Sequence, residues 1–142
     1  MADKLMMEVF VELERDKVVE LNGANCRVKM LPFAGTVRSD LFSGIVAPGG
    51  VDTQVTNAAG VRNMSARYML LGEDYTGAPC RIYVENEGWF EGGVPMPFRT
   101  VPAFVTDSPV LAARLRGGRI VGEGSEAADG LHIRFYEADG QG

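Results

Sequence analysis

Strand-like segments separated by glycine turns, over residues 42–71, constrain the fold of this chain more than any other stretch. A Pro-Gly-Gly turn at residues 48–50 separates the first two segments, and an Ala-Ala-Gly turn at residues 58–60 leads into the third. Such residues end strands and favour tight turns. Because side chains alternate between the faces of a strand, Asp52 and Gln54 share one face of the second segment, opposite its valines. The stretch predicts a β-meander with a polar cluster on one face of the sheet.

Length and composition restrict the class of protein. The chain has 142 residues, of which 46% are hydrophobic and 23% charged, so we expect one packed domain over residues 1–142, with a frayed tail at about residues 138–142. The net charge of −5 and the scattered basic residues argue against nucleic acid as a partner. No apolar run approaches the ~20 residues of a membrane span. The first residues lack the pattern of a secretion signal, so we expect no membrane partner and a cytoplasmic location.

Short apolar or alternating runs recur along the rest of the chain, as is typical of β-strands. They cover residues 5–13, 17–21, 26–31, 80–86, 98–106, 119–123 and 131–137. Pro32 and Gly35 are expected to break the chain between two of these runs. Residues 87–97 contain three glycines and two prolines and are expected to form a long loop, whose apolar tip at Trp89 could cover the mouth of a pocket.

One helix is expected, over residues 108–117. Ser108 can cap its first turn, Pro109 suits the first helical position, and Gly117 can close it. At about two turns, this helix is too short to form a layer of its own. Six or more short strands with one short helix predict an all-β fold, either an antiparallel barrel or a sandwich.

Three further patterns do not support metal or nucleotide chemistry. Cys26 and Cys80 are far apart and outside any C-x-x-C motif, so we expect two reduced thiols. His132 is the single histidine, has no cysteine pair beside it, and fits an ordinary strand histidine better than a zinc ligand or a catalytic base. Residues 122–127 fit G-x-G-x-x-A, but the loop carries two acidic residues and is followed by a turn instead of a helix. We therefore expect no cofactor and no metal.

Asp52 is the strongest candidate for chemistry. It follows the tight turn at residues 48–50 on a predicted strand, and burial inside a barrel would raise the pKa of its carboxyl group. Arg67 and Arg99 could pair with it, and Tyr68 and Tyr83 could donate hydrogen bonds. Such a group could act as a proton-transfer site in which Asp52 is the base or acid and an arginine or tyrosine stabilises an enolate-like anion.

Five motifs occur along the chain in a characteristic order. They are F-x-G-x-V-x-P-G-G-x-D-x-Q at residues 42–54, A-R-Y-x-L at 66–70, I-Y-V-x-N-x-G at 82–88, F-R-T-x-P-x-F-x-T at 98–106 and V-G-x-G at 121–124. In this order and spacing they resemble the DUF3237 family, also called UPF0311, over residues 34–136. The resemblance implies a single antiparallel, calycin-like β-barrel with one short helix. Members of the family mostly have no assigned function, so the resemblance supports the fold more than an activity.

The resemblance also implies which positions to follow. Carried across residue by residue, these are Asp52, Gln54, Arg67, Tyr83, Asn86 and Arg99. The chain departs from the family pattern at Thr53, where an aromatic residue is frequent, and in a longer loop at residues 73–79. Departures at the rim of a pocket bear on which substrate is bound.

Three functions are compatible with these observations. The one we favour is a cofactor-free acid–base enzyme of lyase, isomerase or cyclase type, catalysing enolisation, retro-aldol cleavage or Michael-type addition and elimination on a small hydrophobic carbonyl or phenolic compound. The alternatives are a non-enzymatic binding protein for such a compound and a structural subunit. The expected catalytic residues are Asp52, Arg67, Tyr83 and Arg99, and the expected substrate-binding residues are Gln54, Tyr68, Asn86, Trp89 and Phe98. Apolar outer strands would also allow a homo-oligomer.

Overall fold

The protein is described by a computed structural model that covers residues 4–116, 119–128 and 130–137. Within these residues the chain folds into strands, a 3-10 turn and one α-helix. In order they are β1 (Lys4–Leu13), η1 (Arg15–Lys17), β2 (Val19–Asn22), β3 (Cys26–Arg38), β4 (Phe42–Val46), β5 (Val51–Asn57), β6 (Val61–Asp74), β7 (Pro79–Glu91), β8 (Phe98–Thr106), α1 (Pro109–Arg116), β9 (Ile120–Ala127) and β10 (Gly130–Glu137).

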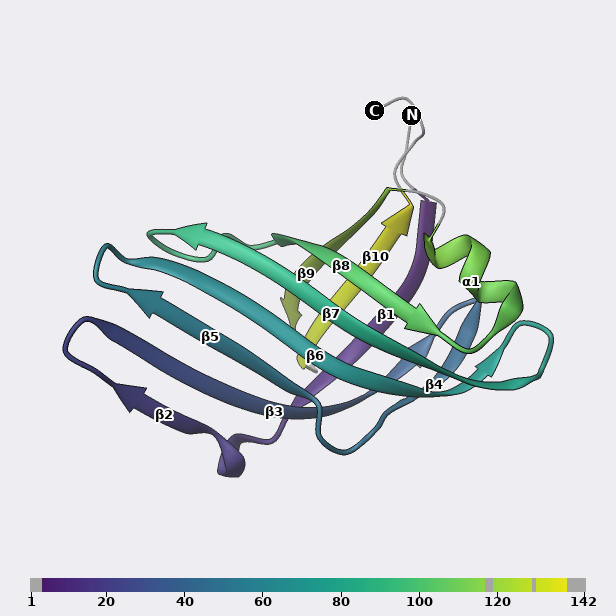
Figure 1. The fold of residues 1–142 in the computed structure, drawn as a ribbon, viewed down its shortest axis with the longest axis horizontal. Helices are drawn as coiled ribbons and strands as arrows, with labels where there is room; N and C mark the ends of the chain where they lie inside the picture. Colours follow the sequence, from purple (N-terminus) through teal and green to yellow (C-terminus); the bar gives the residue numbers. More distant parts are fainter. Residues whose placement is uncertain (1–3, 117–118, 129, 138–142) are drawn as a thin grey trace.

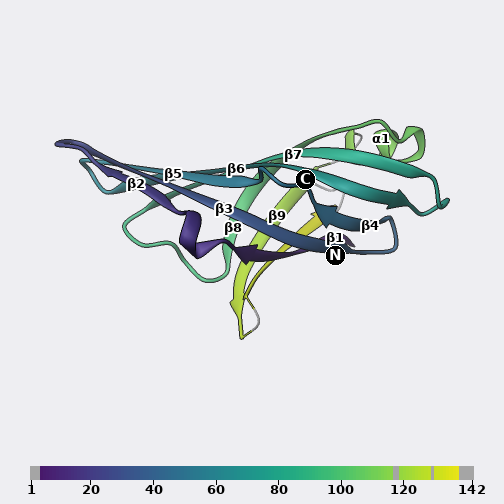
Figure 2. The ribbon, with the colours of Figure 1, turned by 90° about the horizontal axis from the view of Figure 1, so that it is seen from below.

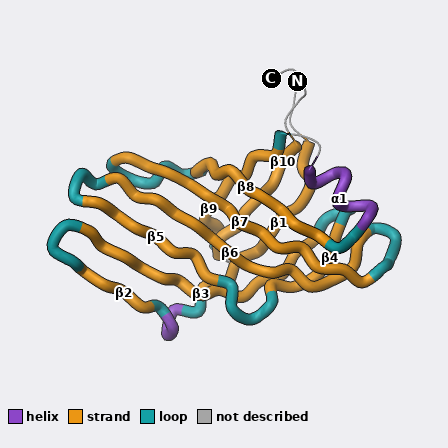
Figure 3. The backbone as a smooth tube through the Cα atoms, in the orientation of Figure 1, coloured by secondary structure: helices purple, strands orange, loops and turns teal. Residues whose placement is uncertain are grey.

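The strands form one antiparallel sheet that closes on itself (Figure 1). Strand β1 pairs with β10 on one side and with β3 on the other, which joins the two ends of the order β10-β9-β8-β7-β6. Strands β4 and β5 both lie between β3 and β6, so they occupy one position in the closed sheet. Counted this way the barrel has 8 strands, and Figure 3 shows how little of the described chain lies outside strands and α1. The prediction of an all-β antiparallel barrel with one short helix is confirmed.

Two sequence-based expectations about breaks are wrong. Strand β3 continues through Pro32 and Gly35. Pro32 lies where the neighbour of β3 changes from β2 to β1, and a Cβ atom at Gly35 would meet the backbone oxygen of Phe10 in β1. Strand β7 likewise extends to Glu91 and includes Trp89, because Gly88 and Trp89 lie within the ladder to β6.

Helix α1 begins as the sequence predicts. The Ser108 hydroxyl oxygen accepts a hydrogen bond from the backbone N–H of Leu111 at 3.2 Å, which satisfies one of the free donors of the first turn. The helix packs beside β8, with Leu111 and Leu115 buried. The expected cap at Gly117 and the expected frayed tail at residues 138–142 lie outside the described residues. No helix among the described residues is long and apolar enough to span a membrane.

The half of the barrel beside α1 is filled by side chains. Fully buried residues there come from β1, β3, β4, β6, β7, α1 and β10. They are Met7, Val9, Val37, Phe42, Leu70, Ile82, Val84, Leu111 and Phe135. Packing of this kind excludes a ligand from this half.

The opposite half is open. In the part of β3 before Phe33, the strand no longer pairs with β1 and pairs instead with the short edge strand β2. The ends of β2, β3, β5 and β6 therefore project past the closed part of the barrel, as Figure 2 shows. The inner face of this projecting sheet is continuous with the barrel interior, and we refer to it as the open end.

Candidate functional site

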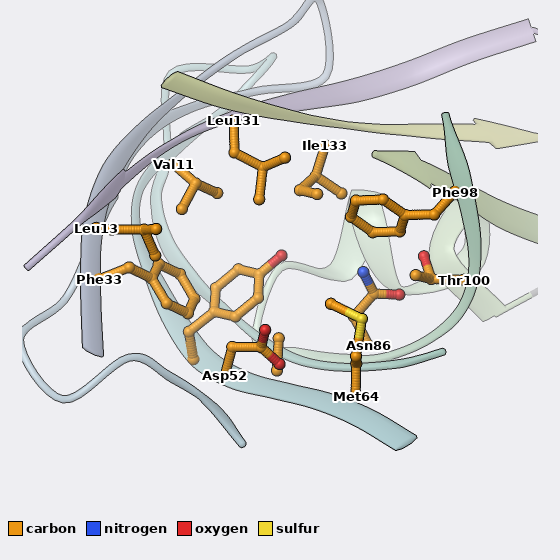
Figure 4. A pocket seen from close by; sticks show the side chains of 12 residues that line it. Val11, Leu13, Phe33, Asp52, Met64, Asn86, Phe98, Thr100, Leu131 and Ile133 are labelled. Atoms are coloured by element: carbon orange, nitrogen blue, oxygen red, sulfur yellow. The ribbon is translucent and has the colours of Figure 1, made fainter. Parts of the chain in front are cut away.

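A cavity lies between the packed half and the open end. Its volume is about 50 Å³. The lining residues are Val11, Leu13, Phe33, Asp52, Met64, Ala66, Tyr68, Asn86, Phe98, Thr100, Leu131 and Ile133. Figure 4 shows apolar side chains from β1 and β10 along one wall, with Asp52, Asn86 and Thr100 on the other side. A mostly apolar cavity with a few converging polar groups is typical of a small-molecule site.

The strand register explains why polar side chains meet here. Asp52 of β5 is paired with Ala66 of β6, and Ala66 with Asn86 of β7. Residues directly opposite one another in a ladder point to the same face. Asp52 and Asn86 therefore lie in one row across the sheet, separated by the small side chain of Ala66.

Two glycines of β9 make room for the side chains of Phe98 and Thr100, which line the cavity from β8. Phe98 is paired with Gly124, and Thr100 with Gly122. A Cβ atom at Gly124 would collide with the Phe98 ring, and one at Gly122 would collide with the Thr100 hydroxyl oxygen. The residues that fit a nucleotide-binding pattern in the sequence thus lie in a strand, where their lack of a side chain lets Phe98 and Thr100 turn into the barrel.

Among the described residues, only one of the two oxygens of the Asp52 carboxyl group has a hydrogen-bond partner. Its Oδ2 accepts a hydrogen bond from the Gln54 side-chain amide at 2.9 Å, while its Oδ1 is buried without a hydrogen-bond partner among the described residues. Burial raises the pKa of Asp52, and the Gln54 hydrogen bond and the charge of Arg62 partly oppose that shift. A carboxyl group in this state has a pKa closer to neutrality and an oxygen whose hydrogen-bonding capacity is unused among the described residues.

Three other polar groups share the cavity. The side-chain oxygen of Asn86 and the hydroxyl oxygen of Thr100 are buried and have no hydrogen-bond partner among the described residues. With Oδ1 of Asp52, three such atoms come from residues that line one cavity. An unpaired buried polar atom costs about 1–3 kcal/mol, so the three together indicate a place where a ligand or water completes the hydrogen bonds. Burial also raises the pKa of Tyr68, whose ring packs edge-on against Phe33 with centroids 5.1 Å apart. Its hydroxyl therefore stays protonated and can donate.

The structure brings together some of the expected site residues. Asp52, Tyr68, Asn86 and Phe98 line the cavity, and Gln54 orients Asp52. Sequence reasoning missed the other lining residues, among them Thr100. The signal for Thr100 was available, because it alternates with Arg99 and so shares a face with Phe98.

The remaining expected residues point away from the cavity. The expectation that Arg67, Tyr83 and Arg99 join Asp52 inside the barrel is wrong. Arg67 is paired with Glu85 on the outer face, at 4.0 Å and with 60% of its side chain exposed. The Tyr83 hydroxyl donates to Glu85 at 3.1 Å on the same face.

Arg99 and Trp89 follow the same rule of alternation. Arg99 is exposed between the inward-facing Phe98 and Thr100. Trp89 is 62% exposed on the outer face of β7, so it does not form a lid over the cavity. In each case the neighbouring residue along the strand takes the inner face.

The histidine and the cysteines lie elsewhere. His132 points away from the cavity, 3.5 Å from a carboxylate oxygen of Glu8 and edge-on to Phe10. Cys26 is exposed in β3 and Cys80 is buried in β7, and both are free thiols. Among the described residues, no three His, Cys, Asp or Glu side chains are grouped so that they could hold a metal ion.

Comparison with known proteins agrees with this architecture. Residues 4–138 match the family described as protein of unknown function, DUF3237. This chain belongs to the DUF3237 family. Members of the family are described by that name without an assigned activity, so the cavity itself carries the functional argument.

Individual relatives support the same conclusion. A UPF0311 protein of Clostridium acetobutylicum is 36% identical over 99 residues, which cover 58% of this chain and 60% of that relative, so the match spans about three fifths of the relative's length. A solved structure of a protein of unknown function from the same organism covers 98% of this chain and 100% of its own, with 26% identity and a TM-score of 0.78. A β-barrel-like protein of Acinetobacter baumannii shares the fold at 20% identity, with a TM-score of 0.73 and coverage of 96% and 94%.

Proposed function

We propose that this protein is a cofactor-free acid–base enzyme that removes or transfers a proton next to the carbonyl group of a small organic compound. The observation that carries the proposal is the convergence, at one mostly apolar cavity, of three buried oxygens, on Asp52, Asn86 and Thr100, that have no hydrogen-bond partner among the described residues. Lyase, isomerase and cyclase reactions that pass through an enolate share this first step, and a phenolic compound offers the same chemistry at its oxygen.

Asp52 is the proposed base. Asp52 lines the cavity, its Oδ1 has no hydrogen-bond partner among the described residues, and the Gln54 amide holds Oδ2 in place. In the forward step Oδ1 takes the proton from the carbon beside the carbonyl, and the electron pair moves to the carbonyl oxygen as an enolate. The raised pKa of Asp52 brings the carboxylate closer to the basicity such a transfer requires. Return of the proton to a different atom of the substrate completes an isomerisation.

Tyr68 is the proposed stabiliser of the developing anion. Its buried hydroxyl stays protonated, because burial raises the pKa of the phenol, and it lines the same cavity as Asp52. A hydrogen bond that strengthens as negative charge develops on the oxygen contributes about 10²–10³ in rate. The Asn86 amide and the Thr100 hydroxyl would hold the substrate in place through the bonds that they lack.

The size of the cavity limits what can react there. A volume of about 50 Å³ exceeds the minimum for a single water, but it admits only a few non-hydrogen atoms. The reacting end of the substrate is therefore small, and the rest of the molecule must extend towards the open end of the barrel.

Proton exchange in heavy water tests the proposal. A panel of small ketones and β-diketones is incubated with the protein in D₂O, and loss of the signal of the proton on the carbon beside the carbonyl is followed by NMR. We expect Asp52→Asn to lower the catalysed exchange rate by about 10²–10⁴ and Tyr68→Phe by about 10²–10³. Asp40→Asn, at an exposed aspartate between β3 and β4, is the matched control and should exchange like the wild type.

Two results would decide against proton transfer by Asp52. Wild-type rates in Asp52→Asn would remove Asp52 as the base. Binding of a panel compound without any catalysed exchange would favour the second candidate function, a binding protein that uses the same unpaired groups. That alternative is favoured by the same three oxygens, since they need a partner whether or not chemistry follows.

A further inference from the structure

A second hollow of about 140 Å³ lies on the inner face of the open end. It is lined by Glu20, Arg27, Lys29, Gln54, Thr56 and Arg62, and we call it the cationic groove. Three of these residues are basic and one is acidic, in a chain whose net charge is −5. A local excess of positive charge in an acidic protein indicates recognition of an anion more than a general surface property.

The strand register places the cationic groove in line with the cavity. Along β5, Asp52 lines the cavity, and the next inward-facing residues, Gln54 and Thr56, line the groove. Lys29 is paired with Gln54, and Arg62 with Thr56. Strands β3, β5 and β6 each contribute inward-facing residues both to the cavity and, nearer the open end, to the cationic groove. The groove and the cavity therefore form one inner surface.

Gln54 joins the two sites directly. Its amide donates to Asp52 at 2.9 Å, and its side chain also lines the groove. The charge of Arg62 acts on the Asp52 carboxyl group as well and favours its ionised form. An anion bound in the groove would therefore affect the Asp52 carboxyl group in two ways, through the Gln54 hydrogen bond and through the negative charge of the anion.

The positive charges of the cationic groove are available to a ligand. Within the part of the chain that the structure describes, neither Arg27, Lys29 nor Arg62 lies within ion-pairing distance of a carboxylate, although Glu20 lines the same groove. Arg134, by contrast, is paired with Glu8 at 2.9 Å. Guanidinium groups with free donors bind carboxylate and phosphate oxygens well, because two N–H groups can contact two oxygens.

We propose that the cationic groove binds an oxyanion, a carboxylate or a phosphate, carried by the molecule whose reacting end enters the cavity. The substrate is then a small carbonyl compound with an anionic group at its far end. This assignment of the substrate class rests on the proposed function, whereas the oxyanion site itself does not. Since residues rise about 3.3 Å along a strand, the Gln54 and Thr56 rows lie roughly 7 and 13 Å from the Asp52 row, which sets the separation of the two ends.

The binding test uses inorganic phosphate and acetate as separate probes of the full-length protein at low ionic strength, followed by NMR shifts of backbone amides. We expect the amides of the groove strands to shift, and Arg27→Met and Arg62→Met each to weaken binding by about tenfold. Arg81→Met, at an exposed arginine of β7 outside the groove, is the matched control and should bind like the wild type. Preference for phosphate over acetate, or the reverse, identifies which oxyanion the groove prefers.

Two outcomes of that titration overturn the oxyanion site. One is the absence of groove shifts with both probes, and the other is equal binding by the wild type, Arg27→Met and Arg62→Met. Circular dichroism and melting of each variant, compared with Arg81→Met, show whether a loss of binding merely reflects unfolding.

The substrate assignment is tested separately from the proposed function. Anionic and neutral members of a matched carbonyl pair, such as a keto acid and its amide, are compared in the exchange assay. We expect Arg62→Met to raise the ratio of KM for the anionic member to KM for the neutral member by about tenfold, whereas a change in kcat caused by the loss of the Arg62 charge near Asp52 should affect both members alike. Equal turnover of both members, with no effect of Arg62→Met, rejects the assignment even where exchange itself occurs. If Asp52→Asn still binds phosphate or acetate but no longer catalyses exchange, the oxyanion site is present and only the proton transfer is lost. The two proposals can therefore fail separately.

Discussion

Two aspartates, in opposite halves of the barrel, show how the same side chain can serve structure or chemistry. Asp74, at the end of β6, is 5% exposed and accepts hydrogen bonds on both oxygens. Its Oδ1 is bound by the backbone and hydroxyl of Thr76 and more distantly by the backbone of Ala78, and its Oδ2 by the hydroxyl of Ser108 at 2.7 Å. These bonds lower the pKa of Asp74. Its hydrogen-bonding capacity is used within the fold.

Asp52 is in the opposite situation. One oxygen has a single partner, Gln54, the other has none among the described residues, and burial raises the pKa of the carboxyl group. The Asp74 carboxylate ties the β6–β7 turn to the start of α1 through Ser108, which also caps the helix. The comparison teaches that hydrogen-bond satisfaction, more than burial, separates a structural carboxylate from one with capacity left for a ligand.

The largest expected effect on stability is the loss of the Asp74 network. Asp74→Ala removes the acceptor for the Thr76 and Ser108 donors, so the O–H of the buried Ser108 loses the Asp74 carboxylate to which it donates. We expect the melting temperature to fall by roughly 5–10 °C in a thermal scan. Asp16→Ala, in the exposed 3-10 turn, is the matched control and should melt within about 2 °C of the wild type. Equal melting of the two variants would contradict a structural role for Asp74.

A glycine substitution tests whether the cavity wall needs its missing side chains. A Cβ atom at Gly124 would collide with the Phe98 ring, so Gly124→Ala must displace a wall of the cavity. We expect destabilisation of about 1–3 kcal/mol in urea unfolding, as for other overpacked sites. Gly93→Ala is the control, because a Cβ atom there meets no atom within 4 Å. A neutral Gly124→Ala would mean that Phe98 does not define the cavity.

Asp52→Asn sharpens the comparison through its pH dependence. The folded pKa of Asp52 is raised, so the folded state binds its proton more tightly, and stability is lost as pH rises from the unfolded value near ~3.9 through the folded value. Asparagine carries no such cost. We therefore expect the variant to melt about 2–5 °C higher than the wild type at neutral pH. The two should converge below the unfolded pKa.

Asp74 should behave with the opposite sign. Its folded pKa is lowered, so its contribution to stability is present above the unfolded value and is lost as pH falls through the folded value.

Melting curves of Asp52→Asn and Asp40→Asn between acid and neutral pH measure the pH dependence predicted for Asp52. A gain that is the same at every pH, or that appears equally in the exposed Asp40→Asn, would contradict the assigned cause.

The sequence was sufficient for the class of fold and for part of the cavity. Alternation along each strand and turn chemistry predicted the strands, and the Ser108 cap predicted the start of the helix. Asp52 was identified from its place after the turn at residues 48–50 on a predicted strand, and Asn86 from the family resemblance. The extent of β3 and β7 was not predictable, since it depends on which neighbour each strand meets at Pro32 and Gly88.

The partners expected for Asp52 were wrong because alternation was not applied consistently across strands. Tyr83 and Asn86 differ by an odd number of positions in β7, so one strand could not direct both inward. In β5, Val51 and Val55 lie on the outer face, which at the open end also carries the exposed Val19, Leu21 and Met30 of β2 and β3. Hydrophobicity alone therefore gives the wrong facing at the open end. The pairing of Asp52 with Ala66, which places Arg67 outside, depends on a register that only the fold supplies.

Arg67→Met carries the smallest expected effect and tests that facing directly. Arg67 is 60% exposed, and its ion pair with Glu85 spans 4.0 Å in contact with solvent. Pairs of this kind contribute about 0–1 kcal/mol, so we expect melting and catalysed proton exchange to stay close to those of the wild type. Tyr68→Phe, a change at the adjacent residue on the inner face, is the comparison and should lower exchange strongly. If Arg67→Met lowered exchange as much as Tyr68→Phe, the inner and outer faces of β6 would have to be exchanged, and with them the set of residues around Asp52.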